Sequence, residues 1–336
     1  MDFLLATKPN AAEEVYGKIS SIAYPVFLIT TLVSQSILII TAIFFSPKPI
    51  RLLRFLLMKT SFLQVFVSLV LFYVQPRLVA GKSEHVPVYC YGICRHFNKT
   101  LCFALYMFWQ TFSLGVAVSL TFTLYFKYRR LTSNVSFTRR RLVVSLLLAY
   151  IPFYISMICA VVITFRNTLP AVKAPGKENK EVQNLESAEY ELIGIMPLEQ
   201  LPNRINFLML ALGIYVAPVI ALWFRWKSYI AISQKAMGPV LREHTKAVMK
   251  GLTLQVISHF IFYIPMFSLY TYCILSNTEV YFQQFFLTLS PNLTSTVDPL
   301  INLYYVVPYR NQISKLFCCK KTRVTPVVRI SMTSTR

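Results

Sequence analysis

Seven apolar segments constrain the fold of this 336-residue chain more than any other feature. Each carries at most one acidic or basic side chain and is about 20 residues long, which suffices for a helix to cross about 30 Å of hydrocarbon. The segments are Ile22–Phe45, Phe55–Val74, Leu101–Phe126, Leu142–Phe165, Ile205–Phe224, Gly251–Leu275 and Tyr281–Val307. We therefore predict an all-α membrane protein, a bundle of seven transmembrane helices.

Charge orients this predicted bundle. A net charge of +21 would suggest a nucleic-acid partner in a soluble protein. Here the N-terminal segment and the loops on its side carry 11 basic and 11 acidic residues, whereas the other loops and the tail carry 23 basic residues and one acid, Glu243. The positive-inside rule places the N-terminus outside and the C-terminus in the cytoplasm. Orientation in the lipid bilayer thus explains the positive charge, and we expect no nucleic-acid partner.

The predicted organisation has three parts: an extracellular segment (1–20), the seven-helix domain (21–315) and a cytoplasmic tail (316–336). In the longest loop, Arg166–Arg204, the more apolar second half, Ser187–Leu201, is expected to fold back over the outer mouth as a lid. Prolines inside the spans either kink their helices or are simply common in membrane helices, and both interpretations stay open. These prolines are Pro25, Pro152, Pro218, Pro265, Pro291 and Pro299.

Three of the seven cysteines, Cys90, Cys94 and Cys102, fall on the oxidising side of the predicted membrane. The outer loop before the fifth span contains no cysteine. Any disulfide must therefore be local, and Cys94–Cys102 is the favoured pair.

Two modifications are predicted from motifs and topology. Of three glycosylation sequons, Asn98 is the one on the outer side, whereas Asn134 is predicted to be cytoplasmic and Asn292 lies within a span. Cys318 and Cys319 precede two lysines in the tail and form a palmitoylation candidate, with two unmodified thiols as the alternative.

Ionisable groups inside spans are functional candidates, because the bilayer disfavours them strongly. These are Lys59, His259 and Asp298. Asp298 lies on a polar stripe that we expect to face the bundle interior, formed by Thr288, Asn292, Ser295, Asp298 and Asn302. Lys59 and Asp298 have comparable predicted depths, so we predict that they pair and form an interior switch with Asn302. The alternative for Lys59 is snorkelling to the inner interface.

One face of the third span combines aromatic and hydrogen-bonding residues, as ligand pockets do. With groups from span six it predicts an outer cavity for a small molecule. The candidates are Tyr106, Trp109, Gln110, Ser113, His259 and Tyr263, with Ala117 and Tyr270 nearby. Packing between helices is the alternative interpretation of such aromatic stripes.

Basic residues on the inner side can dock an acidic partner. The candidates are Tyr128, Arg129, Arg130, Arg242 and Lys246. Simple orientation by the positive-inside rule explains the same residues equally well.

Several strings then resemble one family in their order and spacing. They are Ser46-Pro47-Lys48 with Arg51-Leu52-Leu53-Arg54, Tyr91-Gly92-Ile93-Cys94-Arg95-His96-Phe97 with Cys102-Phe103, Tyr128-Arg129, and Pro308-Tyr309-Arg310. The chain resembles the nematode serpentine chemoreceptors, specifically their delta class. This resemblance implies a G-protein-coupled receptor in the cell membrane, in the cilium of a chemosensory neuron, that detects an external small molecule and signals to a heterotrimeric G protein.

Some positions depart from familiar receptor patterns. Tyr128-Arg129 lacks the acid of the acidic-Arg-Tyr motif, and Gln64 stands where family members commonly carry Asp, which argues against the usual sodium site. A transporter or ligand-gated channel is the alternative function. The chain has no HExxH, no GxSxG and no pair of intramembrane carboxylates, so we expect no enzyme, no metal and no cofactor.

Overall fold

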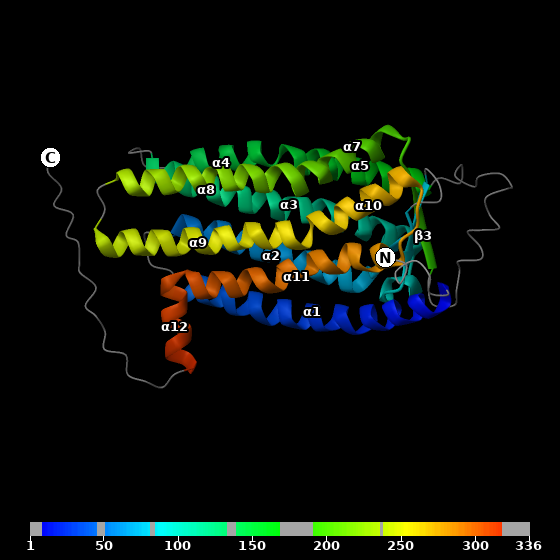
Figure 1. Cartoon of the computed structure of the whole chain (residues 1–336), viewed down its shortest axis with the longest axis horizontal. Coiled ribbons are helices and arrows are strands. Elements are labelled where there is room, and N and C mark those ends of the chain that lie inside the picture. The colour runs from blue at the N-terminus through cyan, green and yellow to red at the C-terminus, as the bar shows by residue number, and fades with distance from the viewer. Residues whose placement is uncertain are drawn as a thin grey trace.

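A computed structural model of the chain describes residues 9–45, 51–80, 85–132, 139–168, 191–235 and 238–317. Within these ranges, long helices run side by side along the molecule and a small sheet closes one end (Figure 1). The helices are α1 (Pro9–Phe45), α2 (Arg51–Val74), α3 (Lys99–Thr132), α4 (Arg139–Ala149), α5 (Ile151–Thr168), α7 (Leu201–Ala211), α8 (Ala217–Gln234), α9 (Pro239–Phe262), α10 (Ile264–Ser276), α11 (Tyr281–Tyr305) and α12 (Val307–Phe317). A π-helical turn, η5 (Leu212–Val216), joins α7 to α8.

The helices match the seven predicted spans once interrupted helices are joined. By length and composition, five helices of the described chain can each cross a membrane, and the bent pair Arg140–Ala149 and Ile151–Asn167 makes a sixth. The helix in the seventh predicted position, α11, is long enough but more polar, and its polar groups are turned inward. Large apolar side chains cover the outside of the bundle, as expected for a surface in contact with lipid. Examples are Ile29, Phe62, Leu148, Leu208 and Ile261.

Three of the six prolines in the spans coincide with interruptions. α4 and α5 meet at an angle of 50° just before Pro152, α9 gives way to α10 just before Pro265, and Pro218 directly follows the η5 turn. Proline removes a backbone hydrogen bond and crowds the preceding turn, which explains these positions. The other three prolines lie inside the continuous helices α1 and α11.

A three-stranded antiparallel sheet closes one end of the bundle, which we call the sheet end. Its strands are β1 (Pro76–Leu78), β2 (His85–Cys90) and β3 (Glu191–Pro197), in the order β1-β2-β3. β3 belongs to the predicted lid, and its partner β2 comes from the loop between α2 and α3. Sequence reasoning expected the lid but not the sheet, because these strands are short and carry Pro76, Pro87 and Pro197.

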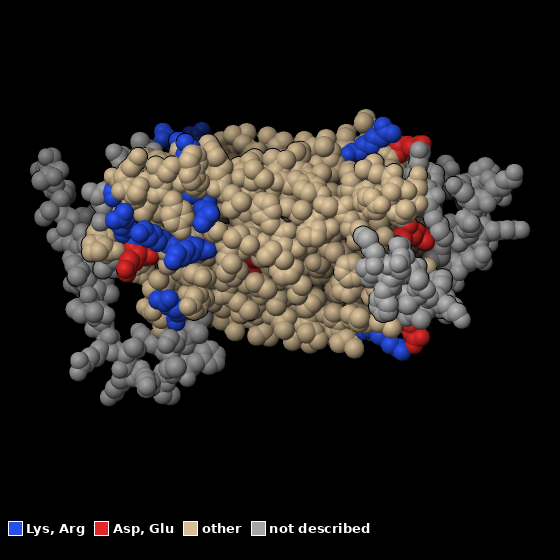
Figure 2. All heavy atoms as spheres, viewed as in Figure 1, with Lys and Arg blue, Asp and Glu red and all other residues tan. Residues whose placement is uncertain are grey.

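The opposite end, which we call the basic end, carries a concentration of positive charge. Figure 2 shows Lys and Arg gathered there with a single visible acid, whereas both signs mix at the sheet end. Glu243 is the one acid of the basic end within the described residues. α1 begins at the sheet end, so part of the predicted N-terminal segment is the first turns of this helix, and α12 lies across the basic end (Figure 1).

Gly92 provides a test of the junction between the sheet and α2. An added Cβ would overlap the backbone carbonyl of Tyr73, and backbone cannot move aside as a flexible side chain can. We expect Gly92→Ala to destabilise the protein by about 1–3 kcal/mol through overpacking. Circular dichroism melting in detergent measures the change. Gly238→Ala is the matched control, because a Cβ there would meet nothing within 4 Å. Equal melting temperatures for both variants would contradict the close contact between Gly92 and the backbone of Tyr73.

Candidate ligand cavity and polar core

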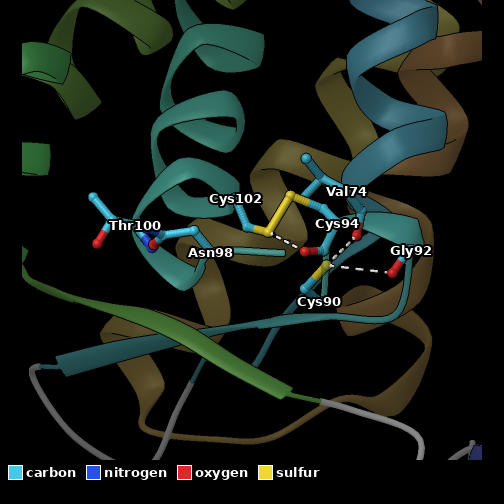
Figure 3. The surroundings of a disulfide bond; sticks show 7 residues. All are labelled: Val74, Cys90, Gly92, Cys94, Asn98, Thr100 and Cys102. Atoms are coloured by element: carbon cyan, nitrogen blue, oxygen red, sulfur yellow. Dashed lines mark hydrogen bonds between the residues drawn. A yellow bond between two sulfur atoms is a disulfide. The ribbon is translucent and has the colours of Figure 1, made fainter. Parts of the chain in front are cut away.

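A disulfide anchors the sheet end to α3. The Sγ atoms of Cys94 and Cys102 are 2.11 Å apart, which joins the short helix η3 (Ile93–His96) to the first turn of α3 (Figure 3). This is the pair that the sequence favoured. Cys90 lies beside it and its thiol donates a hydrogen bond to the Val74 carbonyl at 2.8 Å. Burial raises the pKa of Cys90 to about 11, so it stays a protonated, poorly nucleophilic thiol.

Asn98 lies in the short turn between η3 and α3 and is exposed (Figure 3). Its Oδ1 accepts a hydrogen bond from the backbone N–H of Thr100 at 2.8 Å. Asn292, by contrast, is buried in α11. The other sequon, Asn134, and the two tail cysteines, Cys318 and Cys319, lie outside the described residues.

Beneath the sheet lies a cavity of about 740 Å³, which we call the main cavity. Of the six predicted pocket residues, Tyr106, Trp109, Gln110, Ser113 and Tyr263 line it, and so does Tyr270. Leu78 and Met196, from the two outer strands of the sheet, also line it. The sheet therefore forms the roof of the main cavity.

His259 lies deeper, in a second hollow of about 330 Å³ that we call the His259 hollow. Its ring stacks on Tyr263 with 5.1 Å between ring centroids. Ser113 and Tyr263 line both the main cavity and the His259 hollow, and Leu210 and Ile214 do so as well. The two spaces thus adjoin, and the six predicted residues lie around one continuous region.

A chain of amides and hydroxyls fixes one wall of the main cavity. Gln110 donates to the Tyr106 hydroxyl at 2.5 Å and accepts from the Asn206 amide at 2.9 Å. Asn206 Oδ1 in turn accepts from the Ser156 hydroxyl at 2.7 Å. This chain joins α3, α7 and α5. Sequence reasoning missed Asn206 and Ser156, although Asn203 and Asn206 stand out as amides at the edge of the fifth span.

Three buried polar atoms at these spaces have no hydrogen-bond partner within the described part of the chain: Ser113 Oγ, Asn203 Oδ1 and His259 Nε2. His259 Nδ1 lies 2.8 Å from the Gln255 carbonyl oxygen. Because a carbonyl can only accept, Nδ1 carries the proton and Nε2 presents a lone pair. Unpaired buried polar atoms are costly, so a bound molecule that hydrogen-bonds to them gains affinity.

Asp298 organises a second polar region, which we call the polar core. Its carboxylate accepts from the Gln64 amide at 2.6 Å, and the Ser258 hydroxyl lies 3.4 Å away. Gln64 accepts from Gln35 at 2.7 Å, and Gln255 donates to the Asp298 backbone carbonyl at 3.3 Å. The polar core therefore connects α1, α2, α9 and α11. All five residues of the predicted stripe on α11, including Asn302, are buried.

The predicted pairing of Lys59 with Asp298 is wrong. Lys59 Nζ instead lies 3.3 Å from the ring centroid of Tyr150, between α4 and α5. The reason is rotational: Lys59 and Gln64 are five residues apart on α2, which separates them by about 140° around the helix. Gln64 faces Asp298. Lys59 therefore faces a different neighbour, and it also lies about 7.5 Å from Gln64 along the helix axis. The lysine also does not snorkel freely, since its cation rests on an aromatic face.

The predicted partner-facing residues lie at the basic end. Arg129, Arg130, Arg242 and Lys246 are exposed at the ends of α3 and α9. Tyr128 is half-buried and packs against Phe224 of α8, with 5.9 Å between ring centroids. Its role is therefore in holding α3 against α8. Groups of three or more metal-binding side chains are absent from the described residues.

Comparison with known proteins identifies relatives along almost the whole chain. The family model of the serpentine type 7TM GPCR chemoreceptor Srd matches residues 20–315. Serpentine receptor class delta-40 of Caenorhabditis elegans is 30% identical over 320 residues, which cover 94% of this chain and 98% of that protein. Serpentine receptor class delta-44 of the same organism is 30% identical over 315 residues, covering 93% and 96%.

Removal of either half of the disulfide should have the same effect. The bridge closes a separation of eight residues, for which chain entropy predicts a loss of about 2.5 kcal/mol. We expect Cys94→Ser, Cys102→Ser and the double variant to share the same melting temperature, below that of the parent protein. Cys90→Ser, which keeps a donor for the Val74 carbonyl, should change it little. Additive losses for the two single variants would show that the bridge does not form.

A double-mutant cycle tests the polar core. We expect Gln64→Ala and Asp298→Ala to show a coupling energy of about 1 kcal/mol, because each removes the same hydrogen bond. Lys59→Ala with Asp298→Ala serves as the control pair and should be additive. Unfolding titrations in mixed micelles give the required free energies. A coupling energy between Lys59 and Asp298 that exceeds the one between Gln64 and Asp298 would contradict this assignment and support an ion pair of Lys59 with Asp298.

Proposed function

Because the chain belongs to the Srd family of serpentine seven-transmembrane chemoreceptors, we propose that it is a chemosensory G-protein-coupled receptor that detects an external small molecule and signals to a heterotrimeric G protein. The chain is a multi-pass membrane protein of a receptor family. The observation that carries the proposal is the cavity beneath the sheet, with unpaired buried polar atoms on residues that line it. We place this receptor in the cell membrane of the sensory cilium.

The chemistry of the cavity defines the kind of ligand. Six of its 17 lining residues are aromatic, and most of the others are aliphatic. Tyr106 and Trp109 stack at 5.9 Å between ring centroids, and Phe207 and Phe267 at 5.3 Å. Such walls suit a compact apolar or aromatic body. A hydroxyl or N–H on the ligand would donate to His259 Nε2. A receptor pocket of this type needs no cofactor.

A single turn of α9 links the ligand site to the polar core. His259 Nδ1 donates to the carbonyl of Gln255, whose side chain donates to the backbone carbonyl of Asp298. Directly above, the helix is interrupted at Tyr263, before Pro265. A ligand that contacts His259 and Tyr263 therefore acts on a hinge and on the polar core together. We propose that it biases two packings of α9 against α11, with Asp298 and Asn302 at the contact.

The basic end supplies the proposed partner surface. With the sheet end outside and the basic end in the cytoplasm, as the positive-inside rule predicts, the exposed Arg129, Arg130, Arg242 and Lys246 face the G protein. Arginine and lysine at the ends of two helices suit an acidic partner surface. The same orientation exposes Asn98 to glycosylation and places the tail cysteines, Cys318 and Cys319, where palmitoylation would anchor them to the inner leaflet.

A cell-based G-protein activation screen against volatile and water-soluble compounds tests this function. For any agonist found, we expect His259→Phe to raise the half-maximal concentration by about tenfold, since loss of one buried hydrogen bond costs about 1.5 kcal/mol. The maximal response should persist. His96→Phe, an exposed histidine on η3, is the matched control.

The partner surface is tested in the same cells. We expect Arg129→Ala combined with Arg242→Ala to lower the maximal response while the variant still reaches the cell surface and binds agonist. Agonist-evoked current that persists in cells lacking G proteins would contradict the receptor proposal and favour a ligand-gated channel.

A further inference from the structure

A third hollow, which we call the lateral groove, opens on the outside of the bundle. It has a volume of about 1080 Å³ and lies between α3, the α4–α5 bend and the η5–α8 segment. Two of its lining residues, Leu148 and Val216, are 62% and 42% exposed, so the lateral groove is open toward the surface that faces lipid. It is therefore accessible from the side of the bundle that faces the bilayer.

The lining of the lateral groove is mostly apolar and contains three hydroxyl-bearing residues, Thr121, Tyr125 and Ser145. Thr121 donates to the carbonyls of Ala117 and Ala217, each at 3.0 Å, and Ser145 donates to the carbonyl of Leu142 at 3.0 Å. The hydroxyl protons of Thr121 and Ser145 are thus committed to backbone. Lys, Arg, Asp and Glu are absent from the described lining of all three hollows. These spaces favour an uncharged occupant.

The lateral groove continues toward the ligand site. Leu114 and Gly213 line both the lateral groove and the His259 hollow, which itself adjoins the main cavity. Gly213 lies in the η5 turn, and a Cβ there would overlap Leu114 Cδ1. The lateral groove and the His259 hollow are therefore separated by a partition, where the Leu114 side chain packs against the backbone of Gly213. Leu114 is buried, and a change of its rotamer would open the partition without movement of a helix.

The end of the main cavity that faces the sheet is covered. Leu78 of β1, Met196 of β3 and Leu198, which follows β3, line the cavity there. The sheet is held by its ladder from β1 to β3 and by the adjoining disulfide. A molecule that approached from this end would have to displace a hydrogen-bonded sheet, whereas one from the side would have to move only Leu114.

We propose that the receptor takes an uncharged, mainly apolar ligand with a hydroxyl or N–H for His259. This ligand dissolves first in the bilayer and enters the cavity sideways, through the lateral groove and between Leu114 and Gly213. The inference rests on the proposed function, since it names the ligand class and the route for the same site. Apolar molecules concentrate in the bilayer because each buried methylene contributes about 0.8 kcal/mol. The bilayer then acts as the reservoir that feeds the cavity.

Tryptophan fluorescence can follow this entry without knowledge of the natural ligand. The chain has three tryptophans, so Trp223→Phe with Trp226→Phe leaves Trp109, in the main cavity, as the sole emitter. The probe is 1-bromooctane, an uncharged apolar molecule whose bromine quenches tryptophan on contact. Full-length receptor in vesicles is mixed rapidly with vesicles that contain the probe. A Trp109→Phe chain, which retains the exposed Trp223 and Trp226, reports when the probe reaches the bilayer.

Two variants narrow the route at different points. Val216→Phe fills the lateral groove, and Gly213→Val presses on Leu114 at the partition. The matched control is Val219→Phe, on the same stretch of helix and 57% exposed but outside the lining of the groove. We expect Val216→Phe and Gly213→Val to slow quenching of Trp109 by about tenfold or more, a barrier increase of about 1.4 kcal/mol. Val219→Phe should match the parent rate.

Three results would overturn the lateral route. One is an unchanged quenching rate in Val216→Phe, which remains informative even where Gly213→Val does not fold. A second is a rate that increases only when the sheet is loosened by Cys94→Ser. The third is equally strong quenching of Trp109 by phospholipids brominated on their acyl chains, because lipid would then occupy the route. Entry of bromooctane without any G-protein activation in the compound screen would instead contradict the receptor proposal and leave the route intact.

Discussion

The burial of an acidic side chain among apolar helices is the constraint on which the rest of the bundle depends. Asp298 is fully buried, and no cation lies against it among the described residues. A carboxyl group in this position is tolerable only if neighbouring groups hydrogen-bond to it. Gln64 does so from α2, and Gln35 holds Gln64 from α1. The Ser258 hydroxyl of α9 lies 3.4 Å from the carboxyl group and donates mainly to the Gln255 carbonyl at 2.7 Å. The register of these helices against α11 is therefore set by polar contacts, while apolar contacts fill the remaining space.

Unpaired buried atoms occur both in the polar core, at Gln35 Oε1 and Gln255 Oε1, and around the cavity. In the polar core the carboxyl group of Asp298 accepts from the Gln64 amide, whereas Ser113 Oγ, Asn203 Oδ1 and His259 Nε2 meet no partner in the described chain. Unlike Gln35 and Gln255, the residues Ser113, Asn203 and His259 line open space, so a bound molecule can supply the missing partners there. The sheet above and the aromatic walls around them keep bulk water from being an equivalent partner.

Hydropathy and helical periodicity were sufficient to predict the spans, the buried stripe on α11 and the lining of the cavity by span three. They failed where an answer depends on rotation or on contacts distant in sequence. The depth of Lys59 was estimated from residue counting, but the face it occupies depends on how α2 is turned, which the position of Gln64 decides. The sheet was missed because β2 pairs with a strand about 100 residues later, and neither strand alternates clearly between polar and apolar residues.

The interruptions in the helices give these separate features a common logic. A straight helix resists bending. Here the helix is interrupted between α9 and α10, close to His259, and a π turn lies next to Leu114. π turns and proline breaks free backbone groups and allow local rearrangement. Both interruptions border the His259 hollow, where residues of the cavity, the lateral groove and the turn of α9 that leads to Asp298 meet. A molecule that fills this hollow therefore contacts both deformable points at once, which a ligand confined to the roof of the main cavity does not.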